Sequence, residues 1–88
     1  MRFEWDSRKA AENLRNHGVS FDEASSVFAD PLGIAYPDPD HSESERRLVT
    51  FGYSSSGRLL VVSHTERGDT SRIINARPAT RSEQTIYE

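Results

Sequence analysis

The chain has 88 residues, a formal net charge of −3 and no cysteine. The lack of cysteine excludes disulfides, thiolate zinc sites and a cysteine nucleophile. This length predicts one domain, residues 1–88, whose small core would gain stability from a permanent partner or a second copy. Its polar N-terminus and the lack of any run of ~20 apolar residues predict a cytoplasmic protein that does not enter membranes.

The net charge hides an asymmetry between the two halves of the chain. Residues 1–45 carry four basic and ten acidic side chains, a sum of −6, whereas residues 46–88 carry seven arginines and four acids, a sum of +3. The planar, five-donor guanidinium suits phosphate better than the ammonium of lysine, which the second half lacks. The second half is therefore the candidate for binding a polyanion. The alternative is that arginine usage reflects the base composition of the genome.

The N-terminal third predicts a strand and a helix. Residues 3–5 are typical of a short strand, and Asp6 is placed to cap a helix over residues 7–17. Gly18 supplies the left-handed residue that ends such a helix. The residues expected to share its inner face are Ala10, Leu14 and His17.

A second helix and a polar loop follow. Ser20 and Glu23 form a capping box, and Asp30 with Pro31 ends the helix that it opens. Residues 32–36 predict a strand. The loop after it carries five groups that a metal could use: Asp38, Asp40, His41, Glu43 and Glu45. It lacks the glycine at the sixth position and the glutamate at the twelfth of a calcium loop, so we favour a solvated acidic loop without metal.

From residue 46 the apolar pattern changes to the period of two that is typical of strands. Strands are expected over 46–53, 58–66 and 71–77, and a second capping box, Thr80 to Glu83, opens a short C-terminal helix. The predicted fold class is α+β. Two N-terminal helices and a short C-terminal helix pack on a mainly antiparallel sheet of four to five strands.

Turn chemistry predicts which side chains share a face of this sheet. A two-residue turn at Gly68 and Asp69 pairs His64 with Ile73 and Leu60 with Arg77. The residues then expected on one face are His64, Glu66, Asn75 and Arg77. A symmetric even loop at Ser55 and Ser56 would place Arg47 beside them, whereas a three-residue loop ending in Gly57 would not. Arg72 falls on the opposite face.

This group of side chains fits the metal-free cleavage of RNA. That reaction needs a base for the ribose 2′-hydroxyl, cations around the phosphorane and an acid for the 5′-oxygen. His64 can act as base or acid, Glu66 can orient it, and arginines can hold the phosphate. The alternative is structural, since a strand histidine often serves only as a hydrogen-bonding group and surface Arg–Glu pairs are common.

Three blocks of sequence resemble the BrnT family, the toxins of a bacterial type II toxin–antitoxin pair. They are HGVSF at residues 17–21, HTERGD at residues 64–69, and the R-I-I-x-A-R positions at residues 72–77. The resemblance implies a RelE-like fold, RNA cleavage that arrests translation, and neutralisation by a BrnA-like antitoxin. It also implies homodimers within a hetero-oligomer that reaches operator DNA through the antitoxin. The C-terminal helix departs from the pattern, because it is less basic than the resemblance leads us to expect.

Two hypotheses follow from the sequence. In the first, the protein is a metal-independent endoribonuclease that needs no cofactor. Its predicted catalytic residues are His64, Glu66, Arg67, Arg72 and Arg77, and its predicted RNA-binding residues are Arg47, Arg58, Arg81 and Tyr87. In the second, the protein is a non-catalytic or degenerate module that binds an antitoxin and contributes to an operator-binding complex.

Overall fold

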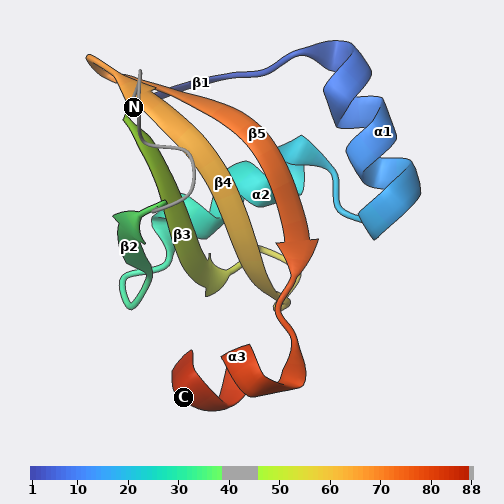
Figure 1. Cartoon of the computed structure of the whole chain (residues 1–88), viewed down its shortest axis with the longest axis vertical. Helices are drawn as coiled ribbons and strands as arrows, with labels where there is room; N and C mark the ends of the chain where they lie inside the picture. The colour runs from blue at the N-terminus through green and yellow to red at the C-terminus, as the bar shows by residue number, and fades with distance from the viewer. Residues whose placement is uncertain (39–45, 88) are drawn as a thin grey trace.

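In the computed structural model, a five-stranded sheet separates α2 from α3, and α1 packs beside β5 (Figure 1). The structure describes residues 1–38 and 46–87. The elements are β1 (Arg2–Glu4), α1 (Ser7–His17), α2 (Phe21–Ser26), the short 3-10 helix η1 (Val27–Ala29), β2 (Ile34–Pro37), β3 (Arg47–Tyr53), β4 (Leu59–Arg67), β5 (Thr70–Pro78) and α3 (Arg81–Tyr87). The predicted α+β class and element order are confirmed.

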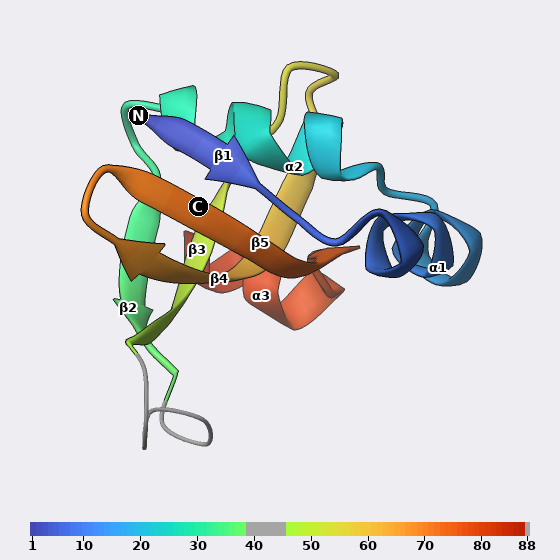
Figure 2. The same ribbon diagram turned by 90° about the horizontal axis from the view of Figure 1, so that it is seen from above.

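The strands lie in the order β1-β5-β4-β3-β2, and only the β1–β5 pair is parallel. Viewed from above, α2 lies on one side of the sheet and α3 on the other (Figure 2). No helix in the described part of the chain is both long and apolar enough to cross a membrane. The acidic loop predicted over residues 37–45 lies outside the described residues from position 39 onward.

Local signals set the ends of the elements. The Asp6 carboxylate accepts hydrogen bonds from the backbone N–H groups of Arg8 and Lys9, at 2.8 and 3.1 Å, and so caps α1. Gly18 ends that helix with a φ of 70°, and Gly68 turns the β4–β5 hairpin with a φ of 61°. Both are left-handed conformations that glycine adopts without steric cost.

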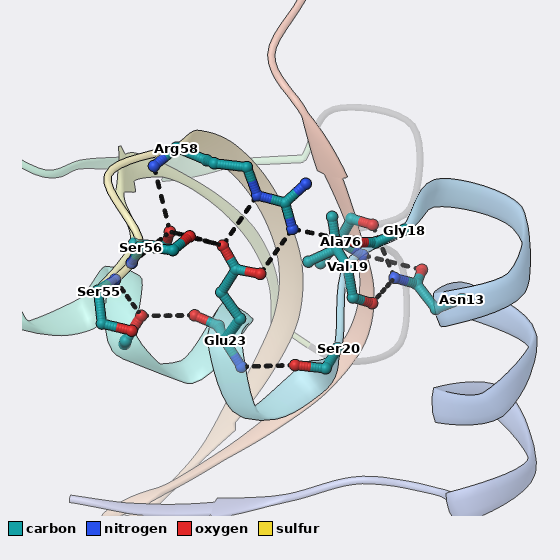
Figure 3. A network of polar contacts seen from close by, with 11 residues as sticks. Asn13, Gly18, Val19, Ser20, Glu23, Ser55, Ser56, Arg58 and Ala76 are labelled. Atoms are coloured by element: carbon teal, nitrogen blue, oxygen red, sulfur yellow. Dashed lines mark hydrogen bonds and ion pairs between the residues drawn. The ribbon is translucent and has the colours of Figure 1, made fainter.

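The inner face of α1 differs from the prediction. Leu14 is 53% exposed, whereas Asn13 is buried against β5. The Asn13 amide donates to the carbonyls of Val19 and Ala76 and accepts from the Ala76 N–H, at 2.8–3.1 Å (Figure 3). These bonds satisfy an edge of β5 that β1 does not reach, because β1 pairs only with residues 70–72. A polar residue therefore occupies the place where an apolar one was expected.

Each face of the sheet has its own apolar cluster. Between the sheet and α2, the buried residues are Val19, Phe21, Ala24, Val27, Leu60, Val62, Ile73 and Ala76. Under α3 there is a smaller cluster of Phe51, Leu59, Val61 and Ala79. The described elements thus cover one face of the sheet with α2 and only one end of the other face with α3 (Figure 1).

A partly exposed ion pair ties α2 to the β3–β4 turn (Figure 3). The Arg58 guanidinium donates to both carboxylate oxygens of Glu23, at 2.6 and 3.0 Å, and also to the carbonyl of Gly18. The hydroxyls of Ser54 and Ser56 donate to the same carboxylate. Arg58 first, and then the two hydroxyls, lower the pKa of Glu23 to about 2. Because the pKa of Glu23 is low in the folded protein, its contribution to the free energy of unfolding changes with pH in the acid range.

We expect Glu23→Gln to lower the free energy of unfolding at pH 7 by about 2 kcal/mol, because a charge-assisted network loses its anion. In the parent protein, the contribution of Glu23 is complete above the unfolded pKa of ~4.5 and is lost as the pH falls toward 2. The variant should lack this part of the acid sensitivity. Urea denaturation between pH 2 and pH 7 measures both effects, and equal acid sensitivity in parent and variant would contradict the prediction.

Candidate nucleic-acid interface

The structure separates the predicted site residues between the two faces of the sheet. His64 pairs with Ile73 as predicted, but Ile74 has no partner on β4, and this β-bulge pairs Arg77 with Val61 instead of Leu60. A one-residue shift moves side chains to the other face. The prediction that His64 and Arg77 share a face is therefore wrong.

Arg47 also lies on the face opposite His64. The β3–β4 turn spans residues 54–58, an odd number, and it pairs Arg47 with Thr65. The even-loop register, which placed Arg47 beside His64, is wrong for this reason. Arg72 pairs with Thr65 from the other side, so it lies on the opposite face from His64, as predicted.

His64 belongs to the interior of the protein. Its side chain is 2% exposed and its ring meets the ring of Phe28 edge to face, with centroids 4.8 Å apart. Its Nδ1 lies 2.6 Å from Glu66 Oε2 and its Nε2 lies 2.7 Å from Thr50 Oγ1. Ser71 donates its hydroxyl to the same Glu66 carboxylate. This arrangement satisfies every polar group of the imidazole without any ligand.

Burial lowers the pKa of His64, although the neighbouring Glu66 acts in the opposite direction. A neutral imidazole fits the hydrogen bonds if Nδ1–H donates to Glu66 and the Thr50 hydroxyl donates to Nε2. The arrangement has the order of a Thr–His–Glu triad. Its hydroxyl and imidazole are buried, however, so a polymer cannot reach them.

The other face of the sheet collects arginines. One row across the strands consists of Arg47, Thr65, Arg72 and Glu4, and the next row consists of Arg67, Thr70 and Arg2. Residues paired in this way project to the same side of a sheet. A small hollow of about 30 Å³ lies among Glu4, Thr65, Arg67, Thr70 and Arg72. We call these two rows, which α3 leaves uncovered, the arginine face.

Two arginines of this face differ in their partners. Arg72 donates to the Glu4 carboxylate at 2.6 Å, but both side chains are about half exposed, so the pair contributes little stability and can open. The Nε of Arg47 is buried and has no hydrogen-bond partner among the described residues. Since buried donors are nearly always paired, this group calls for an acceptor from outside the described residues.

A third group lies where α3 meets the sheet. Arg77 donates to both oxygens of Glu83, at 2.8 and 2.9 Å, and the Thr80 N–H donates to Oε1. These contacts, Arg77 first, lower the pKa of Glu83 to about 2, so it is an anion at neutral pH. Burial, and then the charge of Glu83, raise the pKa of the neighbouring Tyr36, so its hydroxyl keeps its proton.

The remaining predicted RNA-binding residues lie apart from the arginine face or have partners of their own. Arg58 holds Glu23 at the β3–β4 turn. Tyr87 donates its hydroxyl to Asp30 at 2.8 Å and so fastens the end of α3. Arg81 is exposed at the start of α3. RNA binding by these three residues stays a prediction.

Two members of the candidate site were not predicted to belong to it. Glu83 was assigned only to the capping box, which the structure confirms, since the Thr80 hydroxyl accepts from the Glu83 N–H. Tyr36 was assigned only to a strand. The alternation within β2 indicates which side chains share a face, but only the pairing of Tyr36 with Val49 shows that it lies on the side of Arg77.

An α+β domain with one sheet face lined by arginines is typical of proteins that hold a polyanion. A comparison with protein families identifies the class more narrowly: the model described as "Ribonuclease toxin, BrnT, of type II toxin-antitoxin system" matches residues 5–83. The chain therefore belongs to the BrnT family of ribonuclease toxins, and as a type II toxin it has a cognate antitoxin as its partner. The resemblance seen in the sequence is confirmed.

The fold is similar to that of the Brucella abortus ribonuclease toxin BrnT, crystallised at 1.1 Å resolution, with a TM-score of 0.72 and 20% sequence identity. The match covers 92% of this chain and 99% of that chain. A comparison with curated proteins found no match.

Proposed function

We propose that the protein is a metal-independent endoribonuclease that binds RNA across the arginine face and cleaves it beside Arg77. The observation that carries this proposal is the row of Arg47, Thr65 and Arg72, in which the buried Arg47 Nε has no partner within residues 1–38 and 46–87. Because the Arg47 side chain as a whole is partly exposed, a phosphate oxygen can reach its guanidinium once the side chain turns outward, and charge-assisted bonds of this kind are strong. Membership of a ribonuclease toxin family supports RNA as the polyanion.

The reaction needs two proton movements and a stabilised anion. The 2′-oxygen attacks phosphorus and the bond to the 5′-oxygen breaks, so one proton leaves the 2′-hydroxyl and another reaches the 5′-oxygen. We place Arg77 at the phosphorane, where its charge offsets the developing negative charge. The Tyr36 hydroxyl supplies the second proton, and water on the open face takes the first. Tyr36 replaces His64 in this role because His64 is buried.

Neutralisation by a BrnA-like antitoxin is part of the same proposal. An antitoxin that covers the arginine face with acidic side chains would exclude RNA from it. A homodimer within a toxin–antitoxin complex, operator DNA bound through the antitoxin, and a cytoplasmic location complete the proposal. The competing function, a non-catalytic binding module, predicts antitoxin binding without RNA cleavage. Incubation of the purified protein with RNA and EDTA separates the two, because only the metal-independent enzyme cleaves RNA there.

We expect Arg47→Ala and Arg72→Ala each to weaken RNA binding about tenfold at low salt, through the loss of one phosphate contact. Each change should also reduce the slope of log affinity against log salt by about 0.7, the value for one phosphate of a single strand. Fluorescence anisotropy with an RNA that carries a 2′-deoxy nucleotide at the cut measures binding without cleavage. Arg15→Ala, an exposed arginine on α1, is the matched control. Unchanged slopes in both variants would exclude the arginine face as the RNA site.

A further inference from the structure

A pocket opens between β2 and α3, next to Arg77. Its volume is about 360 Å³, and its lining residues are Ile34, Tyr36, Phe51, Glu83, Ile86 and Tyr87. The walls are almost wholly apolar or aromatic. The rings of Tyr36 and Phe51 lie 5.8 Å apart and are tilted by 32°, and Ile34 and Ile86 are more than half exposed at the rim. Such a pocket suits a flat, largely apolar group.

The pocket continues into the arginine-bearing side of the sheet. Ile34, Phe51, Val61 and Arg77 form one row across β2, β3, β4 and β5, so the pocket and the guanidinium lie on the same face. The arginine face begins two rows further along, about 14 Å away at ~3.4 Å per strand residue. A ligand in the pocket therefore has arginine side chains on one side. This arrangement is complementary to a polyanion that carries flat groups.

We propose that this pocket binds one nucleobase of single-stranded RNA, the base next to the phosphate held by Arg77. The proposal rests on the proposed ribonuclease function and adds the substrate class. A base enters such a pocket only when it is unpaired and unstacked from its neighbours, as in single strands and loops. Duplex RNA would reach the arginines but not the pocket.

The polar groups of the pocket set its selectivity. A carboxylate offers about four acceptor positions, and Glu83 already uses three of them for Arg77 Nη1, Arg77 Nη2 and the Thr80 N–H. One position remains on Oε2, and the Tyr36 hydroxyl adds one further group. Every base has an N–H donor for a single acceptor, so we expect stacking to dominate and base preference to be weak.

The test uses a set of RNA strands with 2-aminopurine at successive positions and a 2′-deoxy nucleotide at the cut. Stacking in the pocket should change the fluorescence at one position next to the cut. An abasic nucleotide at that position should weaken binding about 5- to 150-fold, the range of one base–aromatic stack. In a variant with both Ile34→Ala and Ile86→Ala, which opens the rim of the pocket but keeps the rings of Tyr36 and Phe51, the fluorescence change and the abasic penalty should both decrease. Leu14→Ala, an exposed apolar residue on α1, should leave both unchanged.

Several results would overturn the proposal. An abasic penalty that is equal at all positions, or that is undiminished in the Ile34/Ile86 double variant, shows that no base occupies the pocket. Equal affinity for the single strand and for a duplex of the same sequence also shows that no base occupies the pocket. If the double variant keeps the penalty but escapes neutralisation by the antitoxin, the pocket receives a protein side chain instead. If the parent protein binds no RNA at all, the proposed function itself fails.

Discussion

His64→Ala is expected to lower the free energy of unfolding by about 3–4 kcal/mol. The change leaves a cavity under the sheet and removes the hydrogen-bond partner of Thr50 and Glu66. Because the imidazole is buried away from the arginine face, kcat of the folded variant should stay within about threefold of the parent. Urea denaturation and cleavage assays at a temperature where both proteins are folded measure the two quantities.

The pH dependence gives the same residue a second readout. Burial lowers the pKa of His64 in the folded protein below its ordinary value of 6.5, so the unfolded chain takes up a proton first as the pH falls. The contribution of His64 is therefore complete above pH 6.5 and decreases below it. His64→Ala should remove this decrease, whereas His17→Ala should not, because His17 is exposed at the end of α1. A folded His64→Ala protein with a 100-fold loss of kcat would instead show that His64 takes part in catalysis.

The elements were predictable because their signals are local. The carboxylate of Asp6 and the left-handed conformations of Gly18 and Gly68 act within a few residues, and the structure places the element ends close to those signals. The fold class followed from the order of these elements. Local signals do not determine which residues form the inner face of α1. Asn13 is buried because β5 presents an unpaired edge at Ala76, which no pattern within α1 reveals.

The candidate site was harder to predict because it depends on whether the number of residues between paired strand positions is odd or even. One unpaired residue, Ile74, moves Arg77 to the far side of the sheet from His64. An odd turn does the same to Arg47. Four of the predicted arginines, at positions 47, 67, 72 and 77, do lie on one face of the sheet, but the histidine expected among them lies on the other face. The number of residues in the two turns, and the one unpaired residue in β5, thus decide which side chains share a face of the sheet. Amino-acid composition does not predict these numbers.

Arg77→Ala is expected to reduce kcat for RNA cleavage about 100- to 1,000-fold, the cost of removing one group that stabilises charge in a transition state. The same change frees Glu83, whose charge then lies unpaired beside the position we assign to the phosphate and adds repulsion. Single-turnover cleavage of a short RNA with EDTA present measures the loss.

The partner of Arg77 supplies the control for this prediction. Arg77→Ala and Glu83→Gln both break the ion pair that fastens the start of α3, so both should lower stability by a similar amount. Only Arg77→Ala also removes the cation, and Glu83→Gln should keep kcat within about tenfold of the parent. Equal losses of kcat in the two variants would mean that the docking of α3, and not the charge of Arg77, limits the reaction. A large loss confined to Arg77→Ala excludes the docking of α3 as its cause and assigns the loss to the missing positive charge of Arg77, together with the repulsion from the unpaired Glu83.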